Sequence, residues 1–256
     1  ILESKPWVRF GICPFGIYRN EASSREGSKT SGLQTYDDLH ADVLHWVRKG
    51  WVDYIVPQIY WNIGHQAADY AELTHWWGKH TPQKKAQLYI GQHAARTMDG
   101  GQLEEKLALS RRNSSGNSWW SGEDLVKNYK GLGDSLITSY QTYRALLPEV
   151  HGALGKTKAP AAISLILEDT NEDGHMILWD DYREPSDPET AFYYAVYAFP
   201  EGTRPDISDV RYLMSISTNP YFILPSMERG MTYRYMVTAI NRFWQESKPA
   251  SIRISY

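Results

Sequence analysis

The chain has 256 residues, of which 42% are hydrophobic, so it can bury the core of one large domain or of two ordinary ones. Its formal net charge of -3 gives no electrostatic basis for binding nucleic acid. The single cysteine excludes an intrachain disulfide and a cysteine metal cluster, and no apolar run approaches the roughly 20 residues of a membrane-spanning helix.

Strand-like apolar runs alternate with helical patterns through the first half of the chain. Strands are predicted at 7–13, 52–61, 87–92 and 117–121. Helical spacing of apolar side chains predicts helices at 36–49, 67–79, 102–110 and 122–147. Because parallel strands need crossover connections, this order predicts a parallel sheet. Four β-α repeats amount to half of a (β/α)8 barrel, or TIM barrel.

The pattern changes after a Gly/Pro-rich stretch that predicts a linker at 151–159. Seven short strand-like runs without helices then predict a β-sandwich. These runs lie at 163–167, 175–179, 192–198, 210–215, 221–225, 232–241 and 250–256. Tyr233, near the start of one run, resembles the tyrosine corner of fibronectin type III modules, which implies that fold for 160–256. The predicted organisation is therefore an α/β domain at 1–150, the linker, and an all-β domain at 160–256.

Amide and aromatic side chains end two of the predicted strands. The working face of a parallel barrel lies at the carboxyl ends of its strands. Gln58 and Tyr60 share one face of their strand by two-residue alternation, and Trp61 lies on the other. Gln92 ends the next strand in the same manner. A buried amide needs a hydrogen-bond partner, which a sugar hydroxyl or a neighbouring side chain could supply. We therefore expect these residues to bind substrate, with core packing as the alternative.

Two further substrate-binding candidates lie nearby in the sequence. Trp119 and Trp120 follow one another at the end of the fourth strand, so one is expected to point to the core while the other offers a stacking surface. Trp119 is the predicted substrate-binding residue of the pair. Arg19, on a loop, could hold a carboxylate or a sugar oxygen. Its alternative role is a salt bridge to Asp37 or Asp38.

Glu123 is the candidate catalytic residue. Glycosidases normally use two carboxyl groups, and Glu123 is the acid nearest the end of the fourth strand. The competing interpretation is a helix start at Ser121–Asp124, where acidic side chains suit the positive end of the helix dipole.

Several motifs in order resemble one known family. They lie at 5–19, 36–42, 50–61 and 116–121. Residues 5–147 resemble the glycosyl-hydrolase-like 10 family, formerly DUF187, whose members carry a (β/α)8 barrel often followed by a fibronectin-like module. The match begins near the family's fifth strand, so the resemblance implies that the first four strands, with the family's carboxylate-rich motif, are absent. The resemblance therefore implies functional roles only for residues at the rim of the barrel, which are Arg19, Gln58, Tyr60, Trp61, Gln92, Trp119 and Glu123.

The expected function is therefore that of a bacterial glycoside hydrolase fragment acting on an unknown bacterial or dietary glycan and inactive alone. The alternative is a non-catalytic carbohydrate-binding or scaffold protein. We expect a carbohydrate partner, no nucleic acid, no cofactor and no metal. A half-barrel exposes two strand edges, so two copies are expected to pair as a homodimer unless another element covers the edges. The resemblance and the appended module imply a periplasmic or extracellular location.

Overall fold

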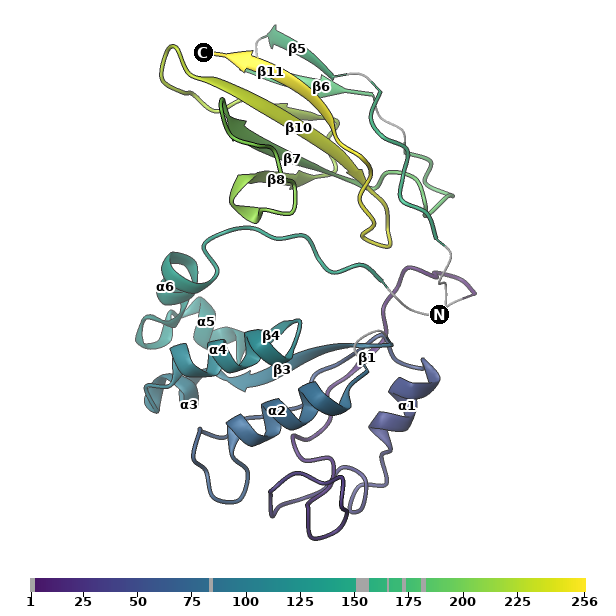
Figure 1. The fold of residues 1–256 in the computed structure, drawn as a ribbon, viewed down its shortest axis with the longest axis vertical. Helices are drawn as coiled ribbons and strands as arrows, with labels where there is room; N and C mark the ends of the chain where they lie inside the picture. The colour runs from purple at the N-terminus through teal and green to yellow at the C-terminus, as the bar shows by residue number, and fades with distance from the viewer. Residues whose placement is uncertain (1–2, 83–84, 151–156, 165, 172–173, 181–182) are drawn as a thin grey trace. The chain divides into compact units, whose positions relative to one another are not determined.

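A computed structural model describes residues 3–82, 85–150, 157–164, 166–171, 174–180 and 183–256. The chain forms two compact units (Figure 1). The first unit runs to Thr142, and the second comprises Tyr143–Val150 with the described residues from 157 onward. Most of the predicted linker at 151–159 lies outside the described residues.

The first unit is built on a four-stranded parallel sheet. Its strands are β1 (Gly11–Ile12), β2 (Tyr54–Ile55), β3 (Gln87–His93) and β4 (Gly116–Trp120). They lie side by side in chain order, and every neighbouring pair is parallel. Isolated bridges from Phe15 to Gln58 and from Gln58 to Gly91 continue the pairing toward the carboxyl ends. The predicted parallel sheet is confirmed.

Helices connect the strands, and their ends follow local capping signals. The helices of the first unit are α1 (Val43–Lys49), α2 (Tyr70–His80), α3 (Ala94–Asp99), α4 (Leu103–Asn113), α5 (Gly122–Val126) and α6 (Leu132–Ser135), with short 3-10 and π turns at Tyr129–Gly131 and Leu136–Tyr140. The Asp42 carboxylate accepts the His45 N–H at the start of α1. Gly50 ends α1 in the left-handed conformation, which glycine adopts without steric cost.

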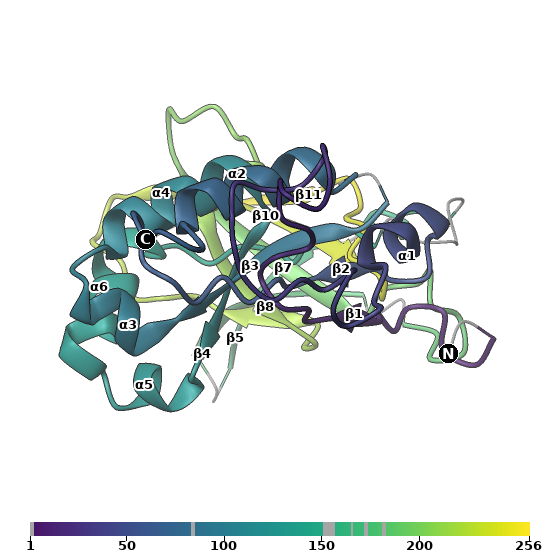
Figure 2. The same cartoon turned by 90° about the horizontal axis from the view of Figure 1, so that it is seen from below.

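One face of this sheet is packed against helices. The core includes Ile55, Ile59, Leu88 and Ile90 from the strand side, with buried side chains of α1 and α2 against them. Helices α2 and α4 lie side by side, as Figures 1 and 2 show. Gly78 permits this approach, because a Cβ there would lie 2.9 Å from the Cβ of Asn113 on α4.

Two predicted helices are shorter than their patterns indicate. The segment predicted at 36–49 becomes helical only at Val43, and Tyr36 and Leu39 are exposed in the preceding turns. His40 has a positive φ of 52°, which interrupts a helix before Asp42 starts one. The segment predicted at 122–147 divides into α5, α6 and short turns, and Gly131 has a left-handed φ of 78° at the break.

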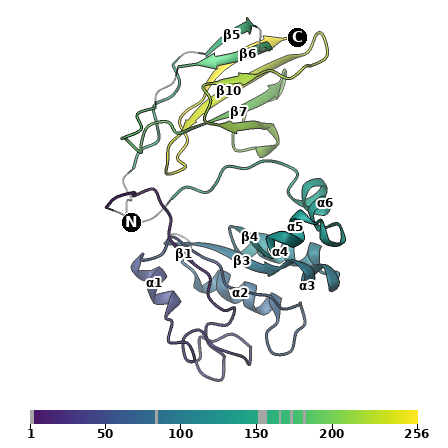
Figure 3. The same ribbon diagram turned by 180° about the vertical axis from the view of Figure 1, so that it is seen from behind.

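The second unit contains two antiparallel sheets, which Figures 1 and 3 show from opposite sides. Its strands are β5 (Ile166–Asn171), β6 (Gly174–Trp179), β7 (Tyr193–Pro200), β8 (Leu213–Ser217), β9 (Tyr221–Ile223), β10 (Thr232–Ile240) and β11 (Ala250–Ser255). The sheet orders are β5-β6-β9 and β11-β10-β7-β8. Each of the seven strands overlaps a predicted run.

The core of the second unit lies between its two sheets. Ile177 and Trp179 from one sheet pack with Tyr194 and Val237 from the other, which is the arrangement of a β-sandwich. A further cluster covers the opposite side of β7 and includes Leu146, so part of the segment before the predicted linker packs with the second unit. In the described part of the chain, no helix has the length and apolar character needed to cross a membrane.

Candidate functional site

Strand alternation gives the first unit's sheet a second face, opposite the helices. Leu88 and Ile90 point to the helices, so the alternate residues of β3, ending in His93, point the other way. The bridges place Phe15 and Gln58 on the same side, and the pairing of His93 with Trp120 adds β4. At the carboxyl edge this open face carries Cys13, Phe15, Gln58, Tyr60, His93 and Trp120.

Three of these side chains form an aromatic row across β2, β3 and β4. The rings of Tyr60 and His93 meet edge to face with centroids 5.8 Å apart. His93 is paired directly with Trp120, a residue that is 62% exposed. Beside the row, the Gln58 Nε2 donates to the Cys13 carbonyl oxygen at 3.1 Å, which orients the amide. This edge therefore presents an exposed indole next to fixed polar groups.

Partial burial shifts the titration of two members of the row. Desolvation, helped by the nearby Arg96 charge, lowers the pKa of His93 and keeps its imidazole neutral at neutral pH. Its Nδ1 accepts the Arg96 N–H at 3.4 Å, so a neutral ring carries its proton on Nε2. Desolvation also raises the pKa of Tyr60. Both groups are therefore neutral hydrogen-bonding partners for a ligand.

Three predicted substrate-binding residues lie on the helical side instead. Trp61 packs against the helix-side core. Gln92 is fully buried and its amide donates to the Asn117 Oδ1 of the neighbouring strand. Trp119 packs with Leu107 and other side chains of the second, smaller helix-side cluster. Of the Trp pair, Trp119 thus points to the core and Trp120 outward. The ligand roles of Trp61, Gln92 and Trp119 stay predictions.

Arg19 forms the salt bridge that was its alternative role. Its Nε and Nη2 each lie 2.8 Å from one Asp37 oxygen, and its guanidinium lies 4.7 Å from the centre of the Tyr36 ring. These contacts fix the side chain on the loop between β1 and α1, apart from the aromatic row. Its predicted substrate contact stays a prediction.

Glu123 lies in the first turn of α5. Ser121 caps this helix, and its hydroxyl and the Asp124 carboxylate form a reciprocal capping box. The Glu123 carboxylate lies 2.5 Å from the Lys127 Nζ, and its side chain is 67% exposed. The helix start proposed from the sequence is therefore present, and the catalytic role of Glu123 stays a prediction.

Lys106 is almost fully buried and was not among the predicted site residues. Its Nζ lies 3.2 Å from both the Asn62 Oδ1 and the Thr97 Oγ1 and 4.9 Å from the centre of the Tyr70 ring. Desolvation lowers its pKa to about 8. Helical spacing from Leu103 places position 106 on the apolar stripe of α4, and that signal could have revealed its burial.

Comparisons with known proteins agree with the family resemblance. The family model described as Glycosyl hydrolase-like 10 matches residues 1–106. "Glycosyl hydrolase YngK" of Bacillus subtilis is 33% identical over 97% of this chain and 50% of its own length. "Glycosyl hydrolase DigH" of Escherichia coli (strain K12) is 44% identical over 36% of this chain and 21% of its own length. The matched part of the chain thus spans half the length of YngK and about a fifth of the length of DigH.

Among solved structures, the fn3 domain of the human collagen alpha-1(XX) chain is similar to part of this chain. The matched region covers 41% of this chain and 91% of the fn3 domain chain, with 16% sequence identity and a TM-score of 0.28.

Proposed function

Because residues 1–106 belong to the glycosyl hydrolase-like 10 family, we propose that this chain supplies half of a (β/α)8 barrel that binds and cleaves a glycan. Under this proposal, residues 1–150 are the carboxyl-terminal half-barrel and 160–256 are a fibronectin type III-like sandwich. The whole protein would hydrolyse a glycosidic bond at the open face, in the periplasm or outside the cell.

The order of the strands supports the barrel. Strands of a (β/α)8 barrel follow one another around the sheet, each joined to the next by a helix on the outside. Strands β1 to β4 have that order, and helices cover the face that would be the barrel's exterior. Parallel sheets are normally covered on both faces, so the open face calls for further structure opposite it.

The single observation that carries the carbohydrate proposal is the row of Tyr60, His93 and Trp120 at the carboxyl edge. An exposed indole offers a flat apolar surface on which the C–H face of a sugar ring can stack. The Gln58 amide and the neutral His93 imidazole can exchange hydrogen bonds with sugar hydroxyls beside it. Enzymes built on such barrels place their active sites at this edge.

Hydrolysis needs two carboxyl groups, and none of the six open-face residues named above is acidic. We therefore propose that residues elsewhere in the whole protein supply at least one of the two carboxyl groups. Under this proposal, the chain alone does not hydrolyse a glycan. The lack of an acidic side chain among these six residues also favours a second candidate function, non-catalytic glycan binding or scaffolding.

Strands β1 and β4 are the outer strands of the sheet, and we propose that two copies pair through them as a homodimer.

Binding and hydrolysis assays with soluble cello-, xylo- and chito-oligosaccharides test these proposals. Trp120→Ala should weaken the affinity for the best ligand by roughly tenfold, as loss of about 1.4 kcal/mol of stacking predicts. Trp51→Ala is the matched control, because that indole is 61% exposed and lies at the opposite end of β2. Equal affinities of the wild type and Trp120→Ala would overturn the assignment of the row.

The same panel separates hydrolysis from binding. Release of new reducing ends by the isolated chain would contradict its proposed inactivity. If that release disappeared in Glu123→Gln, Glu123 would be established as a catalytic residue. Binding without release, by a protein with the complete barrel, would establish the non-catalytic alternative.

A further inference from the structure

A small polar cleft lies beside the loop that joins β1 to α1 and uses none of the open-face residues. Its volume is about 200 Å³. The roughly 300–1,000 Å³ of pockets for drug-sized ligands is larger, so the cleft suits a ligand of about one sugar ring. We call it the loop cleft; its lining residues share polar or aromatic side chains apart from one leucine. They are Tyr18, Arg19, Ser24, Glu26, Tyr36, Asp42, Leu44, Arg48 and Trp76.

Buried contacts fix the walls of the loop cleft. The Trp76 indole donates to the Glu26 carbonyl oxygen at 2.8 Å and stacks on Tyr18 with ring centroids 5.7 Å apart. Asn20, which is buried, holds the base of the loop: its N–H donates to the Gln34 Oε1 at 2.8 Å and its Nδ2 donates to the Gly32 carbonyl oxygen at 2.9 Å. The cleft is therefore formed before any ligand binds, which lowers the entropic cost of binding.

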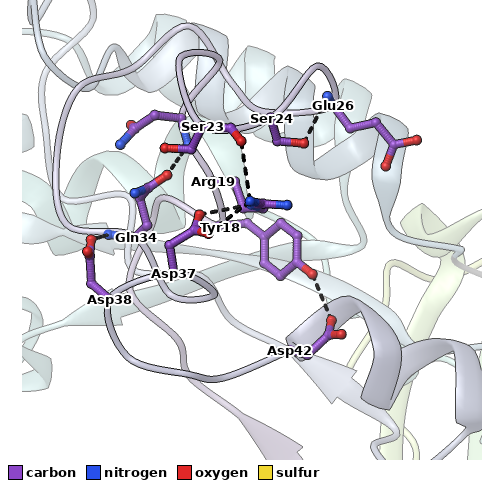
Figure 4. Close-up of polar contacts among 10 residues, drawn as sticks. Tyr18, Arg19, Ser23, Ser24, Glu26, Gln34, Asp37, Asp38 and Asp42 are labelled. Atoms are coloured by element: carbon purple, nitrogen blue, oxygen red, sulfur yellow. Dashed lines mark hydrogen bonds and ion pairs between the residues drawn. The ribbon is translucent and has the colours of Figure 1, made fainter.

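Two charged side chains of the loop cleft, Arg19 and Asp42, are held so that part of each is left for a ligand (Figure 4). Arg19 uses its Nε and Nη2 on Asp37 and on the Ser23 carbonyl oxygen, and these contacts leave its Nη1. The Oδ1 of Asp42 accepts both the Tyr18 O–H at 2.7 Å and the His45 N–H at 3.0 Å, and these contacts leave its Oδ2.

The charges of the lining indicate the class of ligand. Two guanidinium groups, Arg19 and Arg48, share the cleft with two carboxylates, Glu26 and Asp42. A simple anion would meet the carboxylates and a simple cation would meet the guanidinium groups, so neither is favoured. A neutral polyhydroxylated ligand can accept from the arginines and donate to the carboxylates at once, because each hydroxyl does both.

We propose that the loop cleft is a second carbohydrate site, which binds a single pyranose unit through Arg48, Asp42 and Arg19. The choice of a saccharide among polyhydroxylated ligands rests on the proposed function of the open face. In the complete protein, this site would hold a sugar residue or branch of the glycan outside the cleavage position.

The experiment is NMR titration of the 256-residue chain with glucose, galactose, mannose and N-acetylglucosamine in turn. We expect saturable shifts of the Tyr36 and Arg48 signals with one of them, in the millimolar range. Arg48→Met should weaken this binding roughly tenfold, because it removes charged hydrogen bonds. Arg112→Met is the matched control, since Arg112 is likewise exposed in the last turn of a helix, α4.

The outcomes distinguish this proposal from the function of the open face. Trp120→Ala should leave the loop-cleft titration unchanged, and Arg48→Met should leave oligosaccharide binding at Trp120 unchanged. Absence of saturable shifts with all four sugars would overturn the second site. Binding of inorganic phosphate instead, lost in Arg48→Met, would overturn it in favour of an anion site.

Discussion

The parallel sheet of the first unit and the four-stranded sheet of the second are buried differently. Strand β7 contributes Val196 to the core between the sheets and Tyr197 to a cluster on its opposite side. Strand β3 contributes Leu88 to the helix-side core, whereas its alternate residues end at His93 on the open face. The antiparallel unit thus has a strand with hydrophobic clusters on both sides, while the parallel sheet has its main core on one side.

The difference is opposite to what the two sheet types normally show. Antiparallel sheets commonly leave one face to solvent, and parallel sheets are covered on both. On the open face of the parallel sheet, Phe15 and Trp120 are 47% and 62% exposed. Apolar side chains gathered at a strand edge and left exposed mark a binding surface. These exposed side chains therefore support our proposal that the open face of the first unit binds a ligand or further protein.

The largest effect on stability is expected from a substitution at the centre of the helix-side core. Trp77 is fully buried, and its indole donates to the Gly16 carbonyl oxygen at 2.7 Å. Trp77→Ala should lower the free energy of unfolding of the first unit by about 3–5 kcal/mol, because it leaves a cavity. Urea unfolding followed by hydrogen exchange in both units measures it, with Trp51→Ala as control. An equal loss of protection in the second unit would contradict independent cores.

The stability of the first unit should depend on pH through the buried Lys106. Its folded-state pKa of about 8 lies below the ordinary value of 10.5, so the unfolded chain binds more protons between those values. The stability of the first unit should therefore rise as the pH increases from 8 to 10.5, by up to about 3 kcal/mol. Urea midpoints at pH 7.5 and 10 measure this rise. Lys106→Met should abolish it, and an identical rise in that variant would assign the effect to other groups.

The smallest effect is expected in the second unit, at Glu246. Its Oε1 accepts the Tyr197 O–H at 2.7 Å and the Thr238 O–H at 2.6 Å, and both donors are buried. Glu246→Ala leaves two hydroxyls unsatisfied and should lower the stability of the second unit by about 1–3 kcal/mol. Glu246→Gln keeps an acceptor and should cost less. Thermal unfolding of the two variants measures the difference, and equal losses would contradict the hydrogen-bond explanation.

The positions of the strands in both units could be predicted from the sequence because their apolar runs are short and bounded by turn residues. Their lengths could not, since β1 and β2 span two residues each within the longer runs predicted at 7–13 and 52–61. The parallel order of β1 to β4 also followed from the helices between them. The beginning of α1 could not be predicted from apolar spacing, which continues back to Tyr36. Asp42, whose side chain caps the helix, is the local signal that sets its start.

The candidate site was less predictable, because its side chains are sorted by contacts distant in sequence. Adjacent Trp119 and Trp120 give no alternation of apolar and polar residues, so only the pairing with β3 decides which points outward. The partner of the Gln92 amide is Asn117, 25 residues away. An isolated strand pattern cannot distinguish such a partner from a sugar hydroxyl.

The buried Asn20 amide has a consequence for how this protein can change. Asn20 fixes the base of the loop, because its backbone N–H donates to the Gln34 Oε1 and its side-chain amide donates to the Gly32 carbonyl oxygen. Neither contact involves the side chains of the exposed tip at 21–23. Substitutions at the tip can therefore accumulate without reshaping the scaffold beneath. One short loop thus joins a tip that tolerates substitution to a base that does not.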